Sequence, residues 1–307
     1  MASVPMQRTL IKHALASSSA LDSILIQGWV RTRRDAKSFS FLEVNDGSCL
    51  KNLQVIVDAS LTDYVNIEKA TTGASVSLVG KLVESQGKGQ SWEVTAESLT
   101  VIGEAESDFP LQKKGHSLEF LREVAHLRPR SNLFGSVFRV RSRVAYAIHN
   151  FFQEQEFIYV HTPIVTASDC EGAGELFRVT SLDMGDVPLE NGSVDFSKDF
   201  FGQPTYLTVS GQLEGEIFAT ALSNIYTFGP TFRAENSNTN RHANEFWMIE
   251  PEIAFCDLNG NMDLAEVFVK YLVKDALENC STELEFFNRF LDKGLIERLK
   301  FIAERPF

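Results

Sequence analysis

The 307-residue sequence has no apolar run near the about 20 residues that a membrane-spanning helix needs, so a membrane function is not expected. It also lacks any Cys-x-x-Cys pair and any secretory signal. Its four cysteines, Cys49, Cys170, Cys256 and Cys280, are therefore expected to be free thiols in a reducing compartment. No His-Glu-x-x-His or comparable ligand cluster occurs among the six histidines. A structural zinc site is thus not expected, and we assign no metal ligand.

Positive charge is scarce in the chain as a whole, whose formal net charge is −12. This argues against an unselective nucleic-acid binder, because such affinity comes largely from Lys and Arg that neutralise phosphates. Locally the balance reverses, at Arg31, Arg33, Arg34 and Lys37, and again over residues 113–130. Selective nucleic-acid binding through these two patches remains open.

The length is sufficient for two domains, and 44% hydrophobic residues support substantial cores in a soluble globular protein. The first 21 residues contain no acid and carry Arg8 and Lys12 among serines, as organellar transit peptides do. Strand-like sequence begins near Ser23 and leaves little room for a disposable leader. We therefore expect an ordinary N-terminus and a cytoplasmic protein, with the mitochondrion or plastid as the alternative.

The most informative segment lies between Phe228 and Phe255. Residues 227–232 and 246–255 are rich in aromatic and branched side chains, which predicts the two strands of a hairpin. The polar run ENSNTNRHAN between them is typical of a loop. Arg233 and Arg241 flank this loop, and their planar guanidinium groups suit phosphate oxygens. A solvated, charged hairpin tip is the alternative, but the density of charges favours a site for a nucleotide triphosphate.

This segment resembles motif 2 of the class II aminoacyl-tRNA synthetases, in which Phe-Arg-x-Glu, a variable loop and Arg-His-x-x-Glu-Phe follow one another. The resemblance extends from about residue 24 to the end of the chain and is greatest to the asparaginyl enzymes, in the subclass shared with the aspartyl and lysyl enzymes. The matching residues are Phe232, Arg233, Glu235, Arg241, His242, Glu245 and Phe246.

The resemblance implies a role for each matching residue in ATP binding. Arg233 would bridge the ATP α-phosphate and the amino-acid carboxylate, and Arg241 would bind the γ-phosphate, so both are the expected catalytic residues. Phe246 would stack on adenine, and Glu235 would lie near the adenine edge or the tRNA 3′ end. His242 and Glu245 would shape the same loop. The first step would need no covalent nucleophile, because positioning of two bound reactants is the main catalytic device.

Five short alternating runs occupy the N-terminal third, which predicts a small β-barrel of the oligonucleotide-binding type. They are residues 23–30, 38–46, 53–57, 74–83 and 91–102. Phe39 and Phe41 share strand parity and face one side, either for stacking on bases or as part of the core. Similarity to the family's anticodon-binding domain implies that Phe41 stacks on the central anticodon base. Arg34, Gln54 and Glu93 would then read neighbouring bases.

The predicted fold class is α+β, with the OB-fold barrel followed by a class II catalytic domain built on an antiparallel sheet. We expect the anticodon-binding domain at 1–105, a hinge that touches the tRNA at 106–130 and the catalytic domain at 131–307. Apolar residues at helical spacing predict a helix from Val137 to about Gln155. That helix, the strand FIYV and Pro163 resemble motif 1, which implies a homodimer. A buried helix within one chain is the alternative.

The amino-acid pocket is predicted from two further segments. EGAGELF at 171–177 has the composition of a mobile loop and resembles the loop that closes over the amino acid, with Glu171 near its α-amino group. The acidic span 181–203 reads as a surface insertion with no assigned chemistry. In LTVSGQLEGE, Ser210 and Gln212 occupy the positions that would bind the α-amino group.

The lysine position of the aspartyl enzymes is Gly215 here. Aspartate needs a cation for its side chain, whereas a neutral amide needs a donor and an acceptor, so this departure favours asparagine. Either Glu214 or Glu216 would accept from the amide, and Glu216 is preferred. The alternative is that both glutamates point to solvent.

Two amphipathic helices are predicted at 262–278 and 283–303, and the Gly-rich third motif of complete class II enzymes is not found. That part of the family normally carries the Mg²⁺ ligands and an arginine that recognises the side chain. We therefore expect a C-terminally truncated asparagine-tRNA ligase that uses ATP and Mg²⁺ to charge tRNA(Asn) with asparagine, and that forms little adenylate alone. A non-catalytic tRNA-binding remnant and an aspartate-activating paralogue are the alternatives.

Overall fold

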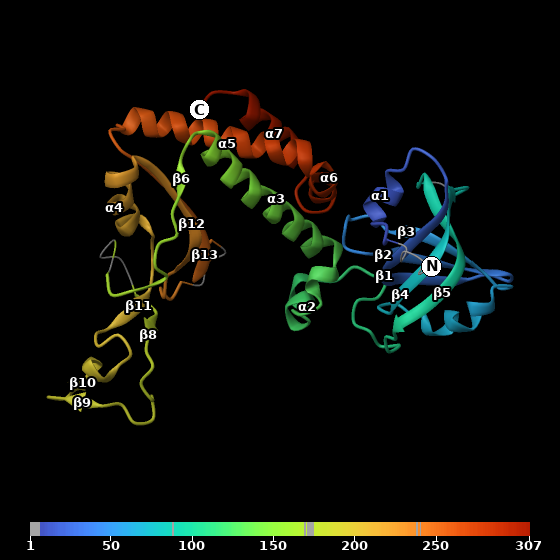
Figure 1. The fold of residues 1–307 in the computed structure, drawn as a ribbon, viewed down its shortest axis with the longest axis horizontal. Helices are drawn as coiled ribbons and strands as arrows, with labels where there is room; N and C mark the ends of the chain where they lie inside the picture. The colour runs from blue at the N-terminus through green and yellow to red at the C-terminus, as the bar shows by residue number, and fades with distance from the viewer. Residues whose placement is uncertain (1–6, 88, 169, 171–174, 238, 240) are drawn as a thin grey trace, which may run out of the picture. The chain divides into compact units, whose positions relative to one another are not determined.

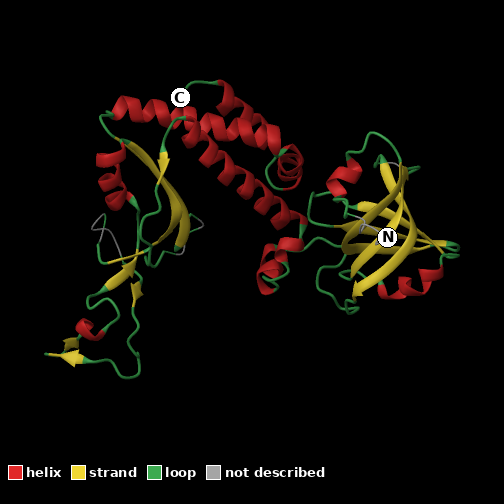
Figure 2. Ribbon diagram, viewed as in Figure 1, coloured by secondary structure: helices red, strands yellow, loops and turns green. Residues whose placement is uncertain are grey.

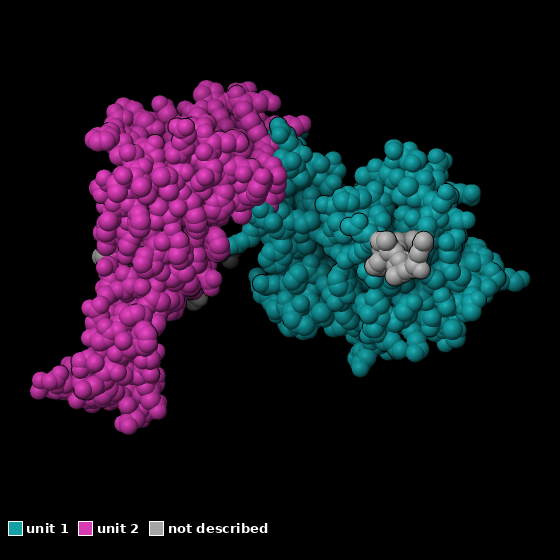
Figure 3. Space-filling view, viewed as in Figure 1, with its two compact units in different colours: residues 1–142, 277–298 teal, residues 143–276, 299–307 magenta. Residues whose placement is uncertain are grey.

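A computed structural model describes residues 7–87, 89–168, 170, 175–237, 239 and 241–307. The chain divides into two compact units, which Figure 3 colours teal and magenta. The first comprises residues 1–142 and 277–298, and the second comprises 143–276 and 299–307. This division does not test the predicted bounds of 1–105, 106–130 and 131–307, which stay a prediction.

The first unit contains the expected closed barrel, in the strand order β1-β2-β3-β5-β4 (Figures 1 and 2). Its strands are β1 (Leu21–Asp35), β2 (Phe39–Asn45), β3 (Leu53–Asp58), β4 (Ser75–Glu84) and β5 (Trp92–Gly103). A short 3₁₀ helix at Thr62–Lys69 connects β3 to β4. All five predicted runs are strands, because each alternates apolar and polar residues between turn-forming residues.

The alternation of β2 settles which side chains fill the barrel. Ser40, Leu42 and Val44 point inward and are fully buried. Phe39 and Phe41 lie on the opposite face and are only half-buried, with ring centroids 4.9 Å apart. The alternative that these two rings belong to the core is therefore wrong, because residues two apart on a strand share a face.

Helix α1 (Ile11–Leu15) closes against the barrel. Ile11 and Ala14 are buried in the same apolar core as the strands. The carboxylate of Asp46 accepts the backbone N–H of Ile11 at 3.0 Å and forms an ion pair with Arg8 at 3.3 Å. Trp92 adds a hydrogen bond from its ring Nε1 to the carbonyl of Ser17 at 2.8 Å. Residues 8–17 thus pack as part of the barrel.

The rest of the first unit is helical. It holds α2 (Leu118–Glu123), a short 3₁₀ helix at Arg128–Arg130, the start of α3 (Asn132–Glu154) and α6 (Ser281–Phe290). Arg139 of α3 forms an ion pair with Glu283 of α6 at 2.8 Å.

The second unit is built on a sheet of order β13-β12-β6. Strand β12 (Asn224–Phe232) pairs antiparallel with β13 (Glu245–Ile253) and parallel with β6 (Ile158–Tyr159). One face of this sheet packs on α3 and α5 (Leu258–Asn279). There the Tyr226 ring stacks on Phe152 at 4.6 Å, and Phe152 lies 5.0 Å from Phe268. The predicted hairpin and the predicted helix before it are both confirmed, although α3 begins five residues before Val137.

The opposite face of the sheet packs on α4 (Gln212–Leu222). A second sheet, of order β7-β11-β8, joins Val165–Thr166, Thr205–Leu207 and Arg178–Val179. The acidic insertion forms the small hairpin of β9 (Leu189–Glu190) and β10 (Ser193–Val194), followed by a 3₁₀ turn at Phe196–Lys198 (Figure 1).

The helix predicted over 283–303 is wrong as a single element, because the chain forms α6 and then α7 (Leu295–Glu304). The break contains Gly294 at φ +93°, a left-handed conformation that helical residues do not adopt. Apolar spacing continues across the break, so periodicity alone did not reveal it.

Candidate functional site

The open face of the β12–β13 hairpin brings the chemically active side chains together. The register places Thr231 opposite Phe246 and Thr227 opposite Glu250. Because side chains alternate along a strand, these four residues share the face that packs on α4. Residues on the other face, such as Tyr226 and Phe228, belong to the apolar core. The hairpin thus separates a core face from a polar face.

Glu250 is the centre of this polar face. Its carboxylate accepts hydrogen bonds from the hydroxyls of Ser210 and Thr227, the latter at 2.7 Å. The backbone N–H of Gly211 donates to both carboxylate oxygens, at 3.2 and 3.1 Å. Ser210 is buried, and its oxygen also accepts the N–H of Gln212 at 3.1 Å. Glu250 therefore fixes the turn that begins α4.

Gly211 allows this close approach. A Cβ at position 211 would lie 2.5 Å from Thr162 Oγ1 and 3.2 Å from Glu250 Oε2. Contacts below 3.0 Å are not tolerated without displacement of a neighbour. A pocket opens beside this residue and is lined by Thr162, Thr208, Thr231 and Glu250, among others.

Helix α4 carries the acids predicted to read the substrate side chain. Gln212 donates its side-chain Nε2 to Glu216 Oε1 at 3.2 Å, one helical turn later. Gly215, at the lysine position of the aspartyl enzymes, packs against β12 and β13. A Cβ there would lie 3.4 Å from both Glu252 Cγ and Ile225 Cδ1.

The three acids around this helix repel one another. Burial, then the charges of Glu216 and Glu250, raise the pKa of the Glu252 carboxyl above its ordinary value. Within the described part of the chain, none of these three glutamates forms an ion pair with a Lys or Arg. The polar face therefore carries a negative potential that suits ammonium and amide groups better than carboxylates.

Arg233 and Phe246 meet at the open end of the hairpin. The Arg233 guanidinium carbon lies 5.5 Å from the Phe246 ring centroid, within the range of a cation–π contact. Asn244 ties the loop ends together, since its side chain donates to the carbonyl of Arg233 at 2.8 Å and to that of Glu235 at 3.3 Å.

The other predicted loop residues lie apart from this pair. Arg241, His242, Glu235 and Glu245 are exposed. The Arg241 N–H donates to Thr239 Oγ1 at 3.3 Å, and the His242 ring bonds the same hydroxyl. The strand register puts Glu245 on the face opposite Phe246. Glu171 lies outside the described residues.

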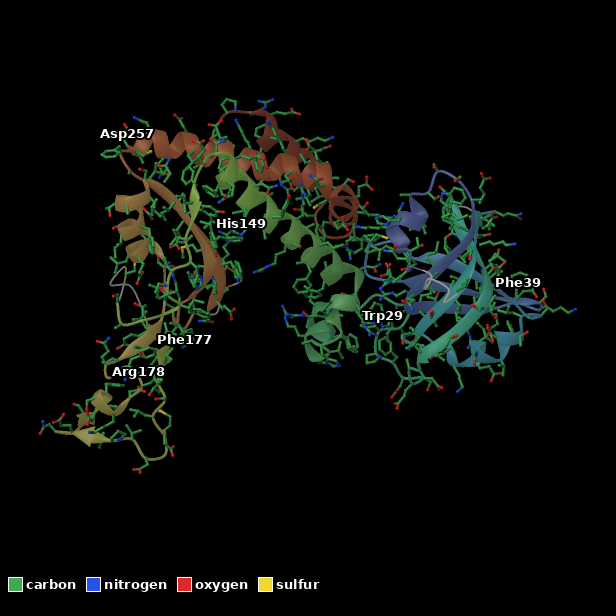
Figure 4. All side chains as sticks on the ribbon, in the orientation of Figure 1. Trp29, Phe39, His149, Phe177, Arg178 and Asp257 are labelled. Carbon is green, nitrogen blue, oxygen red and sulfur yellow. The ribbon has the colours of Figure 1, made fainter. Side chains whose placement is uncertain are left out.

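The barrel presents the second group of predicted residues. Arg34 lies opposite Phe41 across β1 and β2, with its guanidinium carbon 4.5 Å from the ring centroid. On β3 and β5, Gln54 donates to Glu93 Oε2 at 2.8 Å. Phe41 pairs with Ile56, two residues beyond Gln54 on the same face. The four residues therefore lie on one face of the barrel, and Figure 4 labels Phe39 at its edge.

Glu250, Thr227 and Glu252 were not predicted from the sequence. In EPEIAF the two glutamates at 250 and 252 share parity with Phe246, which was a usable signal for their common face. Nothing in the sequence alone pairs Glu250 with Ser210 and Gly211, which are 39 and more residues away.

Among the described residues, no group of three or more His, Cys, Asp or Glu side chains stands in a metal-ligand arrangement. We therefore assign no Mg²⁺ ligand among these residues and derive no step through the ion. None of the described helices is both long and apolar enough to span a bilayer.

Comparison with known families gives two matches that follow the architecture. The model of "tRNA synthetases class II (D, K and N)" matches residues 117–303. The model of the "OB-fold nucleic acid binding domain" matches residues 24–102, which include all but the outermost residues of the barrel strands.

The chain is also similar to curated proteins named asparagine–tRNA ligase. It is 57% identical over 300 residues to the one from Geotalea uraniireducens and 58% identical over 300 residues to that from Nostoc sp.. These alignments cover 98% and 97% of this chain but only 65% of each relative.

Among solved structures, the asparaginyl-tRNA synthetase from Pyrococcus horikoshii complexed with asparaginyl-adenylate aligns with a TM-score of 0.81 and 26% identity. The alignment covers 98% of this chain and 64% of that one. The class II family model covers more than half of the chain, and the chain belongs to the class II tRNA synthetases of the D, K and N group.

Proposed function

We propose that the protein is an asparagine-tRNA ligase, which activates asparagine with ATP and transfers it to tRNA(Asn). The observation that carries this proposal is the hydrogen bond from the Gln212 carboxamide to Glu216 Oε1 at 3.2 Å. The side-chain amide of asparagine is the same functional group. This bond supports Glu216 as the acceptor of the carboxamide N–H of the substrate.

Charge supports asparagine over aspartate. A substrate carboxylate here would be a fourth negative charge beside Glu216, Glu250 and Glu252. Burial and the charges of Glu216 and Glu250 already raise the pKa of Glu252. With Gly215 in place of a lysine, no cation at that position offsets the repulsion. The neutral amide avoids the repulsion and uses Glu216 as its acceptor.

The α-amino group is expected beside the start of α4. Gln212 donates its Nε2 to Glu216, which leaves its Oε1 free to accept from an ammonium group. The Ser210 hydroxyl already donates to Glu250, so we propose that Ser210 positions Gln212 rather than binding the substrate itself. Glu171, outside the described residues, stays a predicted further partner.

ATP is proposed to bind at the open end of the hairpin. Phe246 offers its ring for adenine and Arg233 offers its guanidinium for the α-phosphate, while Arg241 is assigned the γ-phosphate and Glu235, His242 and Glu245 the loop around it. These residues hold the carboxylate oxygen in line with phosphorus and neutralise charge as it develops there. The asparagine carboxylate attacks the α-phosphorus and displaces pyrophosphate. The tRNA 3′ adenosine hydroxyl then attacks the carbonyl carbon of the adenylate, forms the ester and releases AMP.

The barrel is proposed to bind the anticodon through Arg34, Phe41, Gln54 and Glu93. A homodimer is proposed through α3 and β6, where several large apolar side chains are exposed in this single chain. They are Val137, Phe138, Tyr146, Ile158 and Tyr159, each between 38% and 56% exposed.

Substrate choice is tested with two non-hydrolysable sulfamoyl-adenosine analogues, one of asparaginyl-adenylate and one of aspartyl-adenylate. We expect calorimetry to give tighter binding of the asparaginyl analogue, by about 5- to 150-fold, since a polar group that the bound ligand covers and leaves unpaired costs about 1–3 kcal/mol. Equal affinities, a preference for the aspartyl analogue, or no binding of either up to about 1 mM would contradict the proposal.

Two matched variants assign the acceptor. Glu216→Ala should remove the preference, whereas Glu214→Ala should retain it, because Glu214 is engaged by the Thr166 hydroxyl, which donates to it at 3.5 Å. Gly215→Lys should shift the preference towards the aspartyl analogue by supplying the missing cation. A preference that depended on Glu214 instead would reverse the assignment of the two acids.

A further inference from the structure

A recess of about 180 Å³ lies in the first unit. Strand β1 contributes Trp29 and Arg31, and the segment before α3 contributes Arg130. The first turn of α3 contributes Asn132 and Gly135. Figure 4 labels Trp29, whose side chain is 41% exposed.

Two arginines converge on this recess without a carboxylate partner. Arg31 Nη1 donates to the backbone carbonyl of Arg130 at 2.6 Å, so the two residues are held together. The Arg130 guanidinium carbon lies 5.3 Å from the Trp29 ring centroid and 5.7 Å from that of Phe109. Neither arginine forms an ion pair within the described part of the chain. A third lining arginine, Arg139, differs because it is paired with Glu283.

The two arginines give the recess a positive electrostatic potential. Burial, then the charge of Arg130, lowers the pKa of Arg31, while Glu43 partly opposes the shift. Both guanidinium groups nevertheless stay protonated. Of the nearby acids, Glu43 accepts from Asn52 at 3.1 Å and Asp46 holds Arg8 and Ile11, and neither forms an ion pair with Arg31 or Arg130. The guanidinium groups of Arg31 and Arg130 repel each other, and an anion bound between them would lower this electrostatic free energy.

The backbone adds to the same potential. Helix α3 is 23 residues long, and its first turn faces the recess through Asn132 and Gly135. The N-terminal end of a helix carries a partial positive charge and favours anions. Guanidinium forks match the oxygens of phosphate better than those of any other common biological anion except carboxylate.

We infer that Arg31 and Arg130 form a binding site for a phosphate group, with Trp29 as its wall. The inference goes beyond the proposed catalytic function and does not depend on it. The phosphate has two possible sources, a small phosphorylated molecule or the backbone of an RNA chain, and both present the same oxygens to the two arginines.

The site is tested on the whole chain with sodium pyrophosphate as the probe and tryptophan fluorescence as the readout. Pyrophosphate also suits the proposed ATP site, so the signal is taken as the part that disappears in Trp29→Phe. We expect a saturable change in Trp29 fluorescence. The affinity for pyrophosphate derived from it should fall at least tenfold in Arg130→Gln and in Arg31→Gln, which corresponds to about 1.4 kcal/mol. The control Arg298→Gln removes an exposed arginine of the same unit, paired with Asp292, and should change nothing.

The RNA arm measures affinity for an unmodified tRNA transcript against salt concentration. If RNA supplies the phosphate, Arg130→Gln should lower the salt slope by about 0.7–0.9, the value for one lost phosphate contact, while Arg298→Gln leaves it unchanged. A loss in the pyrophosphate arm alone identifies a small ligand, and a loss in the RNA arm identifies the backbone. Unchanged binding in both arms, with circular dichroism that confirms folding of the variants, would overturn the inference.

Discussion

Glu250 on β13 lies directly opposite Thr227 on β12 and accepts a hydrogen bond from its hydroxyl at 2.7 Å. The same carboxylate accepts from Ser210 and from the N–H of Gly211, so one acid joins the sheet to the start of α4. It touches the segment that places Gln212, and it is a positioning residue in the proposed function.

The first prediction follows from this arrangement. Glu250→Gln replaces one of the two carboxylate oxygens that accept these hydrogen bonds with an NH₂ group that cannot accept, which should lower the free energy of unfolding by about 1–3 kcal/mol. The affinity for the asparaginyl analogue should fall at least tenfold. Urea denaturation and calorimetry measure the two effects. Asp263→Asn, an exposed acid on α5, is the control, and an unchanged affinity in Glu250→Gln would argue against the positioning role.

Two glycines of one helix region give the second prediction. Gly211→Ala places a Cβ 2.5 Å from Thr162 Oγ1, so it should destabilise the chain and abolish analogue binding. Gly215→Ala meets nothing closer than 3.4 Å and lies inside α4, where alanine is better than glycine by about 0.5–1 kcal/mol. Thermal unfolding should therefore move in opposite directions for the two variants. Equal losses of thermal stability in the two variants would show that the close contact between position 211 and Thr162 does not require glycine.

The third prediction concerns pH. A carboxyl whose folded-state pKa is raised opposes folding when ionised, so Glu252 destabilises the folded chain at pH values above that pKa. The penalty fades as pH falls through the folded-state pKa and vanishes below the ordinary value of 4.5, where the group is protonated in both states. Glu252→Gln should therefore be more stable than the parent at pH 7, with a gain that shrinks near pH 4.5. Denaturation midpoints at several pH values test this, and a gain that is independent of pH would exclude the charge mechanism.

The fourth prediction addresses the barrel face. Phe41→Leu removes a ring that Arg34 covers at 4.5 Å and that is proposed to stack on an anticodon base. Stacking on an aromatic side chain is worth about 1–3 kcal/mol per base, so affinity for tRNA(Asn) should fall by about 5- to 150-fold. Val65→Ala in the 3₁₀ helix, 77% exposed, is the control. Filter binding that detects no loss in Phe41→Leu would remove this residue from the interface.

The elements that the sequence predicted well share a local cause. The barrel strands and the β12–β13 hairpin alternate residue by residue, and their turns are marked by Gly, Asp and Asn, so short-range patterns suffice. The α6–α7 break was missed because Gly294 interrupts the backbone but not the apolar spacing. The left-handed conformation of Gly294 breaks the helix even though the apolar spacing continues past it.

The candidate site divides in the same way. Arg233 and Phe246 were predicted because family resemblance marks them on the chain, and their contact at 5.5 Å follows from the hairpin register. Glu250 was missed because its importance comes from partners in another part of the chain. A glutamate in a strand looks the same in sequence whether it faces solvent or accepts from Ser210, Gly211 and Thr227.

The hydrogen bond from the Ile11 amide to the carboxylate of Asp46 has a consequence for how the barrel opens. Short terminal helices usually fray, and their amide protons exchange with solvent rapidly. Ile11 is fully buried in the barrel core, and its amide is held by an acid of the loop that follows β2. Deuterium uptake at Ile11 should therefore be as slow as at the central strands, and the first helix of the chain should open only when the whole barrel does.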